Sequence, residues 1–93
     1  KGGVIAFAKS IARENARHSL NVNVVCPGPT DTPLLQAEMA EDPELIQRMV
    51  KIIPFRRLGQ PGDIAGVISF LCSRDSDYMT GQAISVSGGL TMV

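Results

Sequence analysis

The residues best suited to chemistry lie in one short segment, residues 26–32, with the sequence CPGPTDT. Gly28 has no Cβ and would let the backbone approach a ligand closely. Thr30 and Thr32 offer hydroxyl groups and backbone N–H groups that could bind a flat amide. The same pattern also suits a purely structural role, in which a strand ends at the prolines and Thr32 caps a following helix. The spacing of these residues alone favours the structural role.

Helices and strands alternate around this segment. Apolar residues recur at helical spacing over residues 1–18, and the valine-rich run at 20–26 predicts a strand buried on both faces. A second helix is expected at 61–73, beginning at Pro61, and a second strand at 83–86. This alternation implies a parallel sheet in a doubly wound α/β fold. Ligands of such sheets bind beyond the carboxyl ends of the strands, which is where residues 26–32 fall.

Two short helices are expected between the first strand and Pro61. Thr32-Pro33 and Asp42-Pro43 each place a capping residue before a proline, which predicts helices over residues 34–40 and 43–53. Because these helices follow the end of a strand, residues 32–58 are expected to form a lid over the edge of the sheet.

Composition narrows the possible functions. The 93 residues are 44% apolar, and nine basic residues balance nine acidic ones. A neutral chain is a poor candidate for binding nucleic acid or a membrane surface, which usually requires a basic excess. Cys26 and Cys72 lack the spacing of a metal site, so we expect no metal, two free and buried thiols, and a cytoplasmic location. Lys1 lies inside a helical pattern with no capping residue before it, which predicts that further sequence precedes it.

Residues 23–32, with the pattern NxVCPGxxxT, resemble the end of the sixth strand in the short-chain dehydrogenase/reductase family. Four further stretches resemble the family in the same order, at residues 1–3, 57–65, 70–73 and 80–89. The resemblance covers essentially the whole chain and implies that residues 1–93 are the C-terminal part of one NAD(P)-binding, Rossmann-type domain. Ser87 departs from the aspartate that the family often has there, and Thr30 from the usual isoleucine or valine.

The resemblance also implies roles for particular residues. Lys1 would be the catalytic lysine of the Tyr-x-x-x-Lys signature, binding the nicotinamide ribose and lowering the pKa of the catalytic tyrosine. Thr30, through its backbone, and Thr32, through its hydroxyl, would bind the nicotinamide carboxamide, with Pro27 and Gly28 shaping the contact. The tyrosine, serine, asparagine and glycine-rich phosphate-binding loop of the family would precede Lys1. The chain alone is therefore expected to be an incomplete enzyme.

The implied activity is the NAD(P)-dependent interconversion of a secondary alcohol and a ketone. A narrower similarity, at residues 16–18, 23–32 and 85–92, is to 2-hydroxycyclohexanecarboxyl-CoA dehydrogenases and favours an acyl-CoA substrate with NAD. A 3-oxoacyl-carrier-protein reductase, usually using NADPH, is the alternative within the family. A non-catalytic scaffold on the same fold is the alternative outside it. The presence of Lys1 and Thr32 favours an enzyme, and a tyrosine four residues before Lys1 would support that choice.

Two further features suggest partners. Small residues on the helix at 1–18 and the apolar tail within 82–93 favour a homo-oligomer, either a dimer or a tetramer. Basic residues near the end of the lid could bind the phosphates of CoA, because arginine donates paired hydrogen bonds to phosphate. A solvated face without a ligand is the alternative. These basic residues are Arg48, Lys51, Arg56 and Arg57.

Overall fold

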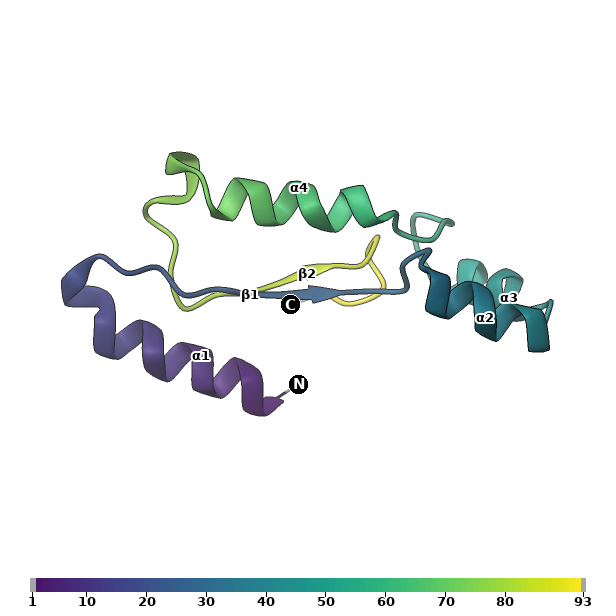
Figure 1. The fold of residues 1–93 in the computed structure, drawn as a ribbon, viewed down its shortest axis with the longest axis horizontal. Helices are drawn as coiled ribbons and strands as arrows, with labels where there is room; N and C mark the ends of the chain where they lie inside the picture. Colours follow the sequence, from purple (N-terminus) through teal and green to yellow (C-terminus); the bar gives the residue numbers. More distant parts are fainter. Residues whose placement is uncertain (1, 93) are drawn as a thin grey trace.

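Two short parallel strands with a helix on each face organise the chain (Figure 1). The structure, a computed structural model, describes residues 2–92. The helices and strands are α1 (Gly2–Asn15), β1 (Val24–Pro27), α2 (Pro33–Glu41), α3 (Leu45–Ile52), α4 (Pro61–Leu71) and β2 (Ala83–Val86), with 3-10 turns η1 (Ala16–His18) and η2 (Arg74–Ser76).

The sheet has the parallel topology that the sequence predicts. Val24 pairs with Ala83, and Pro27 pairs with Val86. Figure 1 shows α4 on one face of the strands, α1 on the opposite face, and α2 and α3 beyond the carboxyl end of β1. Helices on both faces of a parallel sheet define the doubly wound α/β class, so the expected fold class is confirmed.

The start of the first strand was predicted wrongly, because residues 20–23 lie outside β1. Val22 and Asn23 are instead tied to the loop before β2. Val22 donates from its N–H to Thr80 Oγ1 at 3.0 Å, and Asn23 Nδ2 donates to the carbonyl of Met79 at 3.1 Å. Since β2 begins only at Ala83, a regular ladder can form only from Val24 onward. The strand is also half-buried rather than buried on both faces, because the sheet described here has two strands.

The two expected helix starts have different outcomes. Thr32 is the N-cap of α2, as predicted, and its Oγ1 accepts a hydrogen bond from Leu35 N at 3.3 Å. The expected start at Asp42-Pro43 was wrong, since α3 begins at Leu45 without a side-chain cap. The Asp42 carboxylate pairs with Arg48 instead, and this hydrogen bond lowers the pKa of Asp42 below its usual value. The Asp42 carboxylate therefore contacts Arg48 within α3, and the helix begins two residues later than expected.

The main buried cluster lies in the segment from α2 to the start of α4. Leu35, Ile53 and Leu58 form it, and apolar side chains of α3 pack against it. The faces of α1 and α4 are less buried than their apolar patterns predict, since a two-stranded sheet is too narrow to cover them. Phe7 of α1 is 68% exposed. Cys72 is likewise exposed rather than buried, and Cys26 is half-buried; both are free thiols.

Candidate functional site

An open pocket of about 540 Å³ lies at the carboxyl end of β1. It lies between the segment that follows the strand and the first turns of α4, because the parallel crossover brings these parts of the chain together. The residues lining it are Pro27, Gly28, Thr30, Thr32, Pro61, Ile64, Ala65 and Ile68. Four of the five residues predicted to bind a cofactor thus line one pocket. The fifth, Lys1, lies outside the described residues.

The two threonines combine structural bonds with free hydrogen-bonding capacity. Thr30 Oγ1 donates to the carbonyl of Gly28 at 2.8 Å, and this bond fixes the turn after the strand. Within residues 2–92, the backbone N–H of Thr30 has no hydrogen-bond acceptor. Thr32 Oγ1 accepts from Leu35 N, so its hydroxyl hydrogen remains free to donate. Residues 26–32 can therefore end the strand and cap α2 while still offering hydrogen-bond donors to a ligand.

Gly28 is required at its position by the protein itself. A Cβ built on Gly28 would lie 2.7 Å from Ser87 Cβ and 2.8 Å from Ser87 Cα. The close approach arises because Gly28 continues the pairing with β2 by donating from its N–H to Val86 O at 2.9 Å. The sequence suggested that Gly28 leaves space for a ligand, whereas in the structure its missing side chain makes room for the chain at Ser87.

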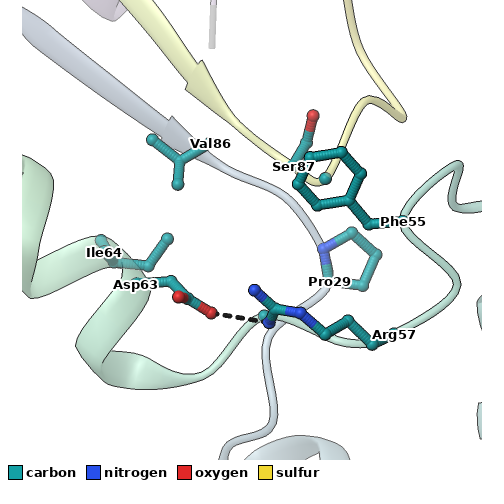
Figure 2. A pocket seen from close by; sticks show the side chains of 9 residues that line it. Pro29, Phe55, Arg57, Asp63, Ile64, Val86 and Ser87 are labelled. Carbon is teal, nitrogen blue, oxygen red and sulfur yellow. Dashed lines mark hydrogen bonds and ion pairs between the residues drawn. The ribbon is translucent and has the colours of Figure 1, made fainter.

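A second, smaller pocket of about 190 Å³ lies beside the first turn of α4 (Figure 2). Its wall carries an ion pair in which Arg57 Nη1 lies 2.9 Å from Asp63 Oδ2. Its lining residues are Pro29, Phe55, Arg57, Gly59, Asp63, Ile64, Val86, Ser87 and Gly88. Sequence reasoning did not assign Arg57 and Asp63 to a site together. An acidic residue three positions after the N-cap, just before an apolar run, is the signal that could have found Asp63.

The ion pair favours the charged form of both partners. The hydrogen bond from Arg57 is the main cause that lowers the pKa of the Asp63 carboxyl, and a backbone N–H donated by Gln60 adds to it. The carboxylate in turn raises the pKa of Arg57. Because the folded-state pKa of Asp63 is depressed, the stabilisation is present above the unfolded pKa of about 3.9. It is lost as the pH falls through the lower folded value, so the pair is intact at neutral pH.

The basic residues near the end of the lid are largely engaged within the chain. Arg48 pairs with Asp42, and Arg57 pairs with Asp63. Arg56 donates to the carbonyl of Lys51. Because Arg48 and Arg57 already have carboxylate partners, the structure favours a solvated face without a bound phosphate at these two positions.

No helix in the described part of the chain is long and apolar enough to cross a membrane. Residues 2–92 also contain no group of three or more His, Cys, Asp or Glu side chains placed to hold a metal ion.

A parallel sheet between helices, with a pocket at the carboxyl end of a strand, defines a doubly wound α/β protein. Comparison with known sequences indicates which family within this class the chain resembles. Residues 1–91 match the sequence profile of a family described as enoyl-(acyl carrier protein) reductase. The 3-oxoacyl-[acyl-carrier-protein] reductase MabA of Mycobacterium tuberculosis is 44% identical over 92 residues, which cover 99% of this chain and 36% of that protein. An acetoacetyl-CoA reductase of an Acinetobacter species is also 44% identical, with the same coverage.

Solved structures give the same result. A short-chain dehydrogenase/reductase family oxidoreductase from Burkholderia thailandensis superposes with a TM-score of 0.91 at 36% identity, covering 96% of this chain and 35% of that one. A 3-oxoacyl-[acyl-carrier protein] reductase from Brucella melitensis with bound NAD has a TM-score of 0.85 at 38% identity, covering 99% of this chain and 32% of that one. The chain belongs to the short-chain dehydrogenase/reductase family. It spans about a third of the length of the curated relatives it matches.

Proposed function

We propose that the protein carrying this chain is an NAD(P)-dependent oxidoreductase that interconverts a secondary alcohol and a ketone. The observation that supports this most directly is the pocket at the carboxyl end of β1, lined by Pro27, Gly28, Thr30 and Thr32. In this proposal residues 1–93 are the C-terminal part of one NAD(P)-binding domain, and residues 32–58 are its lid. Membership of a family of oxidoreductases supports the same function.

The donors in this pocket suit a nicotinamide carboxamide. The carbonyl oxygen of a flat amide accepts hydrogen bonds, so it needs donors close together. The Thr30 backbone N–H and the Thr32 hydroxyl hydrogen can each donate to the amide oxygen. The apolar side chains of Ile64 and Ile68 line the wall contributed by α4. The bound nicotinamide would supply hydride transfer, and these residues would hold its amide and exclude water.

Lys1 is proposed as the catalytic lysine. A free phenol has a pKa near 10 and is a poor base at neutral pH. A cation nearby favours the phenolate and lowers that pKa. The proposed role of Lys1 is to supply this charge to a tyrosine and to hold the ribose hydroxyls.

We propose that the substrate is an acyl thioester. The relatives include a reductase of 3-oxoacyl groups on acyl carrier protein and a reductase of acetoacetyl-CoA. The similarity at residues 16–18, 23–32 and 85–92 favours 2-hydroxycyclohexanecarboxyl-CoA and NAD. The named relatives support a 3-oxoacyl-carrier-protein reductase about equally. These two activities are distinguished by measuring turnover of CoA thioesters and of carrier-protein thioesters by the intact protein, with NAD and with NADP. Failure with every alcohol or ketone tested would favour the non-catalytic scaffold.

Removing the Thr32 hydroxyl tests the cofactor site. Thr32→Val keeps the shape of the side chain but cannot donate, so we expect the KM for the nicotinamide cofactor to rise about two- to tenfold, the scale of one hydrogen bond. The same change removes the N-cap of α2 and should cost about 1 kcal/mol of stability. Thr32→Ser keeps the hydroxyl and serves as the matched control. An unchanged cofactor KM in a folded Thr32→Val protein would contradict the assignment.

We also propose that the intact protein is a cytoplasmic homo-oligomer, a dimer or tetramer. The exposed small residues of α1 and the exposed apolar side chains of Leu90 and Met92 in the tail support an interface through these regions. The free thiols of Cys26 and Cys72 fit a reducing compartment. Light scattering of the intact protein should give a mass of at least two chains, and a monomer would refute the interface.

A further inference from the structure

Two segments far apart in the sequence meet through their backbones beside the candidate cofactor pocket. Gly59 donates from its N–H to the carbonyl of Pro29 at 3.0 Å, and Asp31 donates from its N–H to the carbonyl of Gly59 at 2.8 Å. Thr30 and Gly59 thus form an isolated parallel bridge. The bridged turn, residues 29–31, carries the Thr30 N–H and leads directly to the Thr32 hydroxyl. The position of both donors therefore depends on where residue 59 is held.

The Asp63 carboxylate fixes the segment around Gly59 from both sides. Its Oδ2 accepts from Arg57 Nη1 at 2.9 Å and from Gln60 N at 2.8 Å. Arg57 Nη1 also donates to the carbonyl of Leu58 at 3.1 Å. One oxygen atom thus joins the residues on either side of the Leu58-Gly59 pair to the first turn of α4. Figure 2 shows the ion pair together with Pro29, at the start of the bridged turn.

We propose that Asp63 is a positioning residue for the nicotinamide site. It holds residues 57–60 against α4, these hold residues 29–31 through the bridge at Gly59, and the Thr30 and Thr32 donors are fixed as a result. This inference rests on the proposed function, because it assigns those donors to the cofactor. Asp63 lines the smaller pocket and not the larger one, so it acts through the backbone and not by touching the cofactor.

The test compares Asp63→Asn with wild type in the intact protein. Asparagine keeps an oxygen that can accept from Gln60 N but has no charge to bind Arg57 strongly. We expect the Kd and KM for the nicotinamide cofactor to rise about three- to tenfold, the scale of one hydrogen bond, while kcat changes much less. Amide hydrogen exchange over residues 29–32 should become faster. Asp63→Glu, which keeps the charge, should recover much of the affinity.

Two controls separate positioning from simple helix capping. Asp77→Asn removes the same charge from an exposed carboxylate that forms no ion pair within the described chain, and it should leave cofactor affinity unchanged. Arg57→Gln should weaken cofactor binding as Asp63→Asn does, and the double variant should be no worse than either single one. A structural role alone would lower the melting temperature of Asp63→Asn and leave the cofactor Kd unchanged.

The outcomes also separate this inference from the proposed function. If wild type binds a nicotinamide cofactor and Asp63→Asn binds it equally well, the positioning role is wrong and the proposed function stands. If wild type binds no nicotinamide cofactor at all, the proposed function fails and the positioning role fails with it.

Discussion

Replacing Lys1 with methionine in the intact protein is expected to reduce turnover at neutral pH by on the order of 10²- to 10⁴-fold, the range contributed by a general acid–base group. Methionine keeps much of the length of lysine but removes its charge. Without that charge, the pKa of the proposed catalytic tyrosine should return toward its free value near 10. The loss should therefore shrink as the pH is raised, and the pH–rate profile of kcat/KM should move to higher pH.

Lys9→Met is the matched control for this experiment, because Lys9 is an exposed lysine of α1. It should leave both turnover and the pH profile unchanged. If Lys1→Met retains wild-type turnover with the same pH profile, Lys1 is not the catalytic lysine.

Adding a single methyl group at Gly28 is expected to destabilise the fold by about 1–3 kcal/mol, the usual cost of overpacking. The new Cβ would lie 2.8 Å from Ser87 Cα, which is main chain and cannot rotate away. The end of β1 must then move relative to β2, and the turn carrying Thr30 moves with it. Denaturant unfolding of Gly28→Ala should show the lower stability, and cofactor titration should show weaker binding.

Gly62 and Gly66 of α4 provide the comparison, because a Cβ at either position meets nothing within 4 Å beyond its chain neighbours and the backbone of its own helix. Alanine at these helical positions should be neutral or should stabilise the protein by about 0.5–1 kcal/mol. Equal stability of Gly28→Ala and the two helical variants would mean that the approach of Gly28 to Ser87 is not tight.

Local signals were sufficient for much of the fold. Thr32-Pro33 predicted the start of α2 because a hydroxyl cap and a proline with fixed φ are properties of neighbouring residues. Alternating helices and strands predicted the parallel sheet, since parallel strands require a crossover connection. The pattern at residues 23–32 also placed the candidate site at the end of β1, with four of its residues in one pocket.

The remaining features depend on contacts between distant parts of the chain. Aspartate is a common helix cap, but Asp42 pairs with Arg48 instead. The sequence does not show which of several hydrogen-bond donors a carboxylate will bind. The strand at 20–26 is shorter than its valine pattern suggests, since its length is set by where β2 begins. The bridge between Gly59 and residues 29–31 joins segments about thirty positions apart through backbone groups. Side-chain patterns do not predict such a bridge. The sequence therefore predicted four residues that line the candidate pocket, and only the tertiary structure decided what holds them in place, because the bridge is made by backbone groups.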